Sequence, residues 1–187
     1  MHLFNIHSMN SNPKFLFITI IIFLAALSRL LPHPFNFTPI GAMALFGGAY
    51  FSNKKLSFIV PLIAMFVSDC LIGFHNTIVY VYVSFILITI IGIFISKNIN
   101  ARNIVLASLT SSFLFFIISN FGVWVSDSTS HGIMELFNTY FIAIPFYNND
   151  PLGSFLFNNI LGDLFFNGVL FGSYYLAKNM YPLLARA

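Results

Sequence analysis

The stretch RLLPHPFNFTPIGAMALFGGAYF, residues 29–51, decides how this chain folds. It joins an apolar run that ends in Arg29 to a short glycine-rich run that begins with Thr38-Pro39. Thr is a favoured helix N-cap and Pro is favoured at the first helical position, so these residues predict a helix over 39–51. Such a helix measures about 20 Å at 1.5 Å per residue. That length is less than the ~30 Å hydrocarbon core of a bilayer.

The helix over 39–51 must therefore lie among longer neighbours, with its start below the membrane surface. A helix start carries unpaired backbone N–H groups and a partial positive charge, and starts at half depth often line binding sites. Asn36 and Thr38 lie at this start, so we count them among the candidate substrate-binding residues. The glycines and alanines of the run equally fit a helix that only packs tightly against its neighbours. The sequence leaves both interpretations open.

The composition indicates an integral membrane protein. Of the 187 residues, 58% are hydrophobic and 7% are charged, whereas a soluble domain carries about 25% charged residues. The basic residues occur one or two at a time between apolar runs, so we expect no nucleic-acid partner. The single cysteine excludes an intramolecular disulfide and a Cys-x-x-Cys redox pair. The histidines are scattered over separate loops, so we expect no metal site and no cofactor.

Apolar runs predict an all-α, compact bundle of about six transmembrane helices. They cover 15–31, 39–51, 56–74, 77–96, 103–125 and 152–177. We therefore expect a tail over 1–13, a membrane domain over 14–178 and a second tail over 179–187. Six spans place both termini on one side, and that side then carries all of the eight Lys and Arg residues except Arg29. The positive-inside rule predicts that this side is the cytoplasm.

The connection over 126–151 is long for a loop in a compact protein. Its part 133–146, IMELFNTYFIAIPF, is apolar enough to lie on the membrane or dip into it. It fits a lid, a re-entrant helix or an interfacial anchor. These three interpretations stay open.

Three ionisable residues fall inside the predicted spans, and such residues mark functional sites because each costs about 2.5–3.5 kcal/mol to insert. They are Arg29, Asp69 and Asp163. Asn159 and Asn167 lie four residues before and after Asp163, so the three side chains share one helix face. We count all five residues, Arg29, Asp69, Asn159, Asp163 and Asn167, among the candidate substrate-binding residues. Of these we expect Asp163 to line a substrate pocket and Arg29 with Asp69 to form a more structural pair. The alternative is that all three residues only hold helices together.

Catalytic signatures are missing from the sequence, which has no Gly-x-Ser-x-Gly, no His-Glu-x-x-His and no Walker P-loop. We therefore do not expect an enzyme, and any ATP-driven step would need a partner protein. A structural or assembly protein without a ligand remains the alternative to a substrate-binding one.

Several motifs carry a resemblance to a known family. The runs PFNFTPIGAMALFGGAYF, VPLIAMFVSDCLIGFH, SNFGVWVS, AIPFYNNDPLG and GDLFFNGVLFG resemble an uncharacterised bacterial family of small transport-type proteins, a domain of unknown function. The resemblance covers 29–172. That family is in turn similar to the S components of energy-coupling-factor (ECF) transporters, six-helix membrane proteins that bind a vitamin or cofactor precursor from the outer side.

The resemblance implies uptake of a small vitamin- or cofactor-like solute across the bacterial inner membrane. It also raises an ECF-type coupling subunit with its ATPases as a partner. Some solitary S-like proteins for cobalamin use one cysteine as a cobalt ligand, and Cys70 lies at the outer end of the third predicted helix. A small cysteine in a membrane helix also fits simple packing, so both roles of Cys70 stay open.

Overall fold

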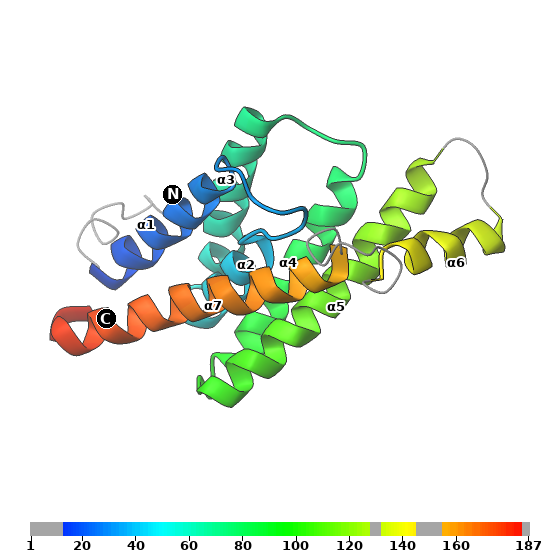
Figure 1. Cartoon of the computed structure of the whole chain (residues 1–187). Helices are drawn as coiled ribbons and strands as arrows, with labels where there is room; N and C mark the ends of the chain where they lie inside the picture. Colours follow the sequence, from blue (N-terminus) through cyan, green and yellow to red (C-terminus); the bar gives the residue numbers. More distant parts are fainter. Residues whose placement is uncertain (1–12, 128–131, 145–154, 185–187) are drawn as a thin grey trace, which may run out of the picture.

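A computed structural model describes residues 13–127, 132–144 and 155–184, and these residues form seven α-helices and no strand (Figure 1). The helices are α1 (Pro13–Ser28), α2 (Ile40–Tyr50), α3 (Lys54–Ile72), α4 (Ile78–Ile95), α5 (Ala101–Ser126), α6 (Ile133–Ile142) and α7 (Phe155–Met180). A short 3₁₀ helix, Pro182–Leu184, follows α7.

Four of these helices, α3, α4, α5 and α7, are long and apolar enough to cross a membrane. The predicted all-α membrane class is thus supported. The helices α1 and α2 have only 16 and 11 residues. Most of the predicted tail over 1–13 lies outside the described residues, and Pro13 already begins α1. The second predicted tail, 179–187, begins inside α7, which continues to Met180.

The short helix α2 is the centre of the bundle and contacts α1, α3, α4, α5 and α7 (Figure 1). Its residues Ala42–Phe46 are 0% exposed. Small residues allow this burial, because backbones then approach closely. A Cβ atom on Gly48 would lie 2.9 Å from the Cα of Gly92 on α4. The glycine-rich run therefore serves tight packing along most of its length.

The bundle exposes large apolar side chains and buries several polar ones beside its apolar core. Large apolar side chains such as Leu16, Val79 and Phe94 are exposed, whereas serines and a threonine are buried. Thr89 Oγ1 donates to the carbonyl of Phe85, four residues earlier, over 2.9 Å. Such bonds satisfy hydroxyl groups inside an apolar bundle. The outer surface is therefore suited to lipid, while the interior combines apolar packing with buried polar groups.

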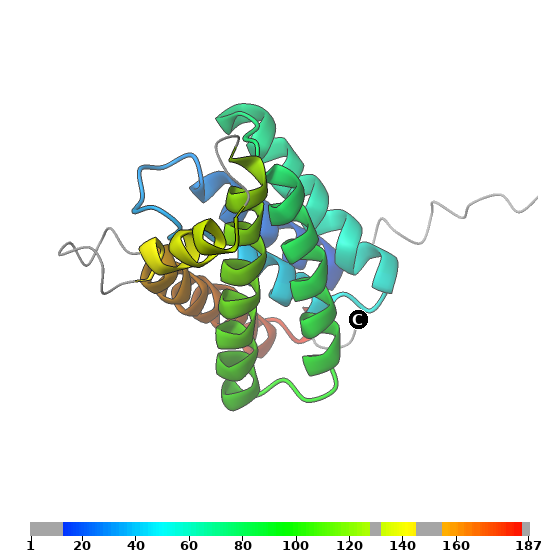
Figure 2. The same ribbon diagram turned by 90° about the vertical axis from the view of Figure 1, so that its right-hand side faces the viewer.

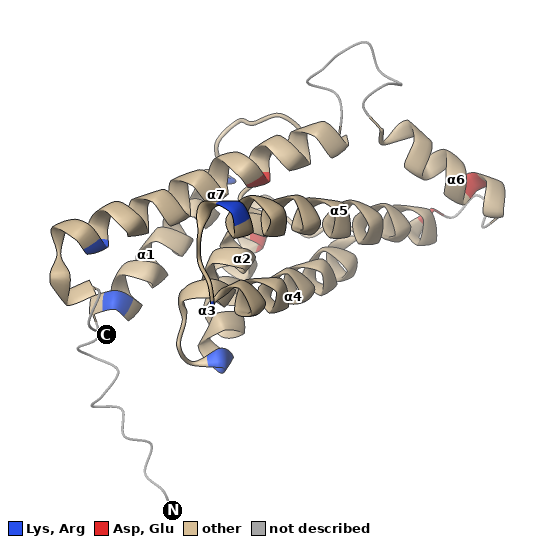
Figure 3. Ribbon diagram, turned by 90° about the horizontal axis from the view of Figure 1, so that it is seen from below, with Lys and Arg blue, Asp and Glu red and all other residues tan. Residues whose placement is uncertain are grey.

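Basic residues gather at one end of the bundle (Figure 3). A cavity of about 430 Å³ is lined by Lys14 at the start of α1, Lys54 at the start of α3 and Lys178 near the end of α7. We call it the basic cavity. The last residues of α2 also line it. The helices thus run alternately up and down, as the predicted topology requires.

Helix α6 lies across α5 (Figure 2) and contacts no other helix among the described elements. Tyr140 holds it there by donating from its hydroxyl to the carbonyl of Ile117 over 2.7 Å. No residue of α6 is buried, and Met134 and Phe137 are exposed. The predicted segment 133–146 is therefore helical over its first ten residues, and 145–154 lie outside the described part.

Candidate functional site

A seam of polar side chains runs between α5 and α7. Asp163 is 1% exposed, and its Oδ2 accepts a hydrogen bond from Ser112 Oγ over 2.7 Å. One turn away on each side, Asn159 Nδ2 donates to the Ser112 carbonyl over 2.9 Å and Asn167 Nδ2 donates to Ser108 Oγ over 3.0 Å. The predicted face of α7 thus points into the bundle, where it meets the serines of α5.

The start of α2 meets this seam at Asp163. A Cβ atom on Gly41 would lie 2.9 Å from Asp163 Cγ, and a Cβ atom on Gly162 would lie 3.0 Å from the backbone nitrogen of Thr38. Glycine at both positions therefore lets the first turn of α2 approach α7. The partial positive charge at a helix start favours an anion there, so the start of α2 suits the negative charge of Asp163 beside it.

Three buried oxygens near these contacts have no hydrogen-bond partner among the described residues. They are Asp163 Oδ1, Asn167 Oδ1 and Ser111 Oγ. A buried polar atom left without a partner costs about 1–3 kcal/mol. Two of the three are acceptors only, because amide and carboxylate oxygens accept. The seam can therefore receive a molecule that donates hydrogen bonds.

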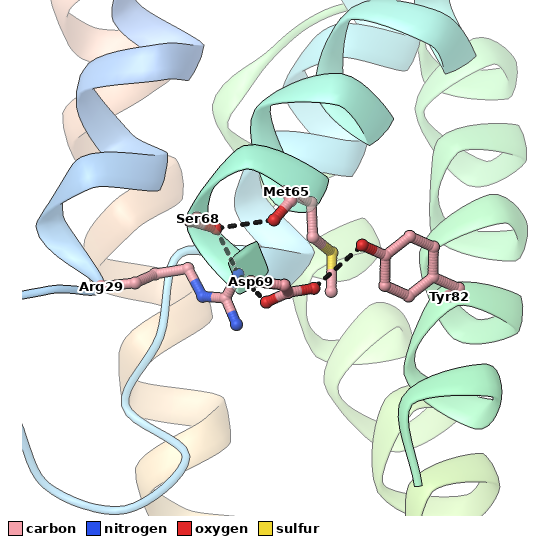
Figure 4. Close-up of polar contacts among 5 residues, drawn as sticks. All are labelled: Arg29, Met65, Ser68, Asp69 and Tyr82. Atoms are coloured by element: carbon pink, nitrogen blue, oxygen red, sulfur yellow. Dashed lines mark hydrogen bonds and ion pairs between the residues drawn. The ribbon is translucent and has the colours of Figure 1, made fainter. Parts of the chain in front are cut away.

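A second polar cluster joins α3 and α4 to the residue that follows α1 (Figure 4). Arg29 Nη1 lies 2.7 Å from Asp69 Oδ1, and the two side chains are 8% and 2% exposed. The same Nη1 donates to Ser68 Oγ over 2.5 Å, and Ser68 Oγ donates to the Met65 carbonyl over 2.8 Å. Tyr82 donates from its hydroxyl to Asp69 Oδ2 over 2.9 Å. Both carboxylate oxygens of Asp69 are thus paired, as expected of a structural link.

The two clusters differ in how completely they are paired. Asp69 has a cation and a hydroxyl as partners, whereas Asp163 accepts from the Ser112 hydroxyl on one oxygen and has no partner on the other among the described residues. The structure does not pair Arg29 with Asp163. A charge with an incomplete set of partners inside the bundle is the stronger candidate for ligand contact.

A family model described as a family of unknown function, DUF6580, matches residues 9–184. The chain belongs to DUF6580. No curated protein and no solved structure matches it. The predicted membership of an uncharacterised family is confirmed, and the further likeness to ECF S components is not part of what the match shows.

In this DUF6580 chain the predicted Thr38 cap is wrong by one residue. Pro39 is the N-cap of α2, no side chain makes a cap bond, and the helix begins at Ile40. Asn36 has a φ of 60°, a left-handed conformation that Asn tolerates better than most residues. No polar contact joins Asn36 to Asp163 among the described residues.

Cys70 follows the buried Asp69 on α3, and its thiol is free and exposed. No group of three or more His, Cys, Asp or Glu side chains that could hold a metal forms in the described part of this DUF6580 protein. No ligand set therefore gathers around Cys70 in the described structure.

The serines of α5 were not among the predicted site residues. Ser108 and Ser112 lie four residues apart, the same spacing as the polar residues of α7, and this match was the available signal. No sequence pattern identified Tyr82 as a site residue, because this DUF6580 sequence is rich in aromatic residues.

Proposed function

We propose that this DUF6580 protein is a substrate-binding membrane protein of S-component type, which takes up a small vitamin- or cofactor-like solute from the outer side. The proposal rests on Asp163 of α7. Its carboxylate is 1% exposed, lies beside the start of the short central helix α2, and has one oxygen without a hydrogen-bond partner among the described residues. A structural role would be served better by full pairing, as at Asp69.

The distribution of charge supports the direction of uptake. The end of the bundle that holds Lys14, Lys54 and Lys178 is the cytoplasmic end by the positive-inside rule. Both termini then lie in the cytoplasm of a bacterial cell, and α1 and α2 complete six membrane segments. The start of α2, with Asp163 beside it, faces the outer half. A solute therefore reaches the carboxylate from outside.

The chemistry of the site limits the solute. Unpaired acceptor oxygens on Asp163 and Asn167 match hydrogen-bond donors such as amino, ammonium or hydroxyl groups. The cavities of about 440, 430 and 130 Å³ are lined by other residues, and in this proposal the start of α2 moves away from α7 to admit the solute. The sequence has no Walker motif, and an ECF-type coupling subunit with ATPases would supply the energy.

Native mass spectrometry of protein extracted gently from cells tests the proposal. We expect the wild-type protein to retain a small donor-bearing molecule, and Asp163→Asn to bind it about tenfold more weakly because the acceptor pattern changes. The matched control is Asp69→Asn, a second buried carboxylate. It should lower the melting temperature while the folded fraction keeps the molecule. A stable Asp163→Asn protein with wild-type affinity would refute the assignment.

A further inference from the structure

The basic cavity lies at the end of the bundle opposite Asp69 and is lined by four helices and two connecting segments. Besides its three lysines it is lined by Ser52 and Ser96 and by the buried Tyr174. The lining residues come from the start of α1, the end of α2, the start of α3, the end of α7 and the segments that join α2 to α3 and α4 to α5. Residues far apart in the sequence thus line one partly open cavity of about 430 Å³.

The charge in the basic cavity is of one sign. No carboxylate lines it among the described residues. Among the described acids, Asp69 and Asp127 lie at the opposite ends of α3 and α5, and Glu135 lies on α6. Lys178 is held in place by the ring of Tyr175, whose centroid is 5.2 Å from its Nζ. Lysine ammonium groups beside hydroxyl donors are the groups that bind phosphate in proteins.

We propose that the basic cavity binds a phosphate group, carried either by an anionic phospholipid or by a free phosphate compound. A neighbouring cavity of about 130 Å³ shares Lys14 and Ser52 with it and is otherwise lined mainly by apolar side chains, among them Ile18 and Leu56. The basic cavity would hold the phosphate headgroup of a phospholipid, and the smaller apolar cavity beside it would hold the start of an acyl chain. Basic pockets between membrane helices at the cytoplasmic side take up such headgroups.

The test compares two double variants with the same change of net charge. Lys54→Gln with Lys178→Gln removes two lysines that line the cavity, and Lys55→Gln with Arg102→Gln removes two basic residues that do not line it. Each protein is titrated in detergent with phosphatidylglycerol, with phosphatidylcholine and with inorganic phosphate, and bound molecules are counted by native mass spectrometry. Removing one lysine should weaken binding about fivefold.

We expect phosphatidylglycerol to bind the wild-type protein in preference to phosphatidylcholine. The Lys54 and Lys178 double variant should bind it about 25-fold more weakly, and the control double variant should stay close to wild type. Binding of inorganic phosphate without lipid, lost in the same variant, would support the site with a free phosphate compound as ligand. Equal losses in both double variants would overturn the proposal, and so would the absence of any preference for an anionic probe.

Discussion

The ion pair between Arg29 and Asp69 gives a sharp prediction about stability. The two side chains are 8% and 2% exposed, and the Nη1–Oδ1 distance is 2.7 Å. In Arg29→Met the carboxylate keeps only the hydrogen bond from Tyr82, and in Asp69→Asn a buried guanidinium loses its counter-ion. Removing one partner of a buried pair costs about 3–5 kcal/mol. For a chain of this size 1 kcal/mol lowers the melting temperature by about 2–4 °C, so each variant should lose about 6–20 °C.

The double variant Arg29→Met with Asp69→Asn separates pairing from packing. In this double variant the amide oxygen at position 69 still accepts the hydrogen bond from Tyr82. Neither position carries a buried charge, so much of the lost stability should return. Melting temperatures in one detergent and equilibrium unfolding in mixed micelles give the coupling free energy of the cycle. We expect about 3 kcal/mol. If the stability losses of the two single variants add up to that of the double variant within about 0.5 kcal/mol, the view that the two residues neutralise each other is refuted.

Two further predictions concern packing and topology. Gly48→Ala places a Cβ atom 2.9 Å from Gly92 Cα and should lower the free energy of unfolding by about 1–3 kcal/mol, measured by thermal unfolding. The control is Gly172→Ala, where a Cβ atom meets nothing within 4 Å. Equal melting temperatures for the two variants would contradict the close helix contact. Reporter fusions at Lys55, at Ser130 and at the C-terminus should read inside, outside and inside. An inside signal at Ser130 would reverse the orientation on which uptake from the outer side depends.

Much of the fold could be predicted because apolar runs and single charges mark helix ends directly. The predicted run 77–96 and the observed α4, Ile78–Ile95, differ by one residue at each end. The first helix was predicted too far along the chain, because 29–31 are apolar apart from Arg29, yet Arg29 leaves the helix to reach Asp69. That displacement depends on a tertiary contact 40 residues away, which local patterns do not contain.

Of the two helices that form the polar seam, only the contribution of α7 was predicted from the sequence. The spacing of Asn159, Asp163 and Asn167 identified the face of α7, because residues four apart share a helix face whatever surrounds them. The facing groups, Ser112 and the start of α2, depend on how helices cross. For the same reason the close approach of the Asp163 carboxylate to Gly41 of α2 could not be predicted from the residues near Thr38.

The position of α2 has a consequence for communication across the membrane. Its 11 residues measure about 16 Å at 1.5 Å per residue, and its first turn lies against Asp163 while its last residues line the basic cavity. The helix α2 thus connects Asp163 with the basic cavity as one rigid segment. If occupancy of one place shifts α2 along its axis, affinity at the other changes by the same factor in either direction, because linkage between two binding equilibria is reciprocal.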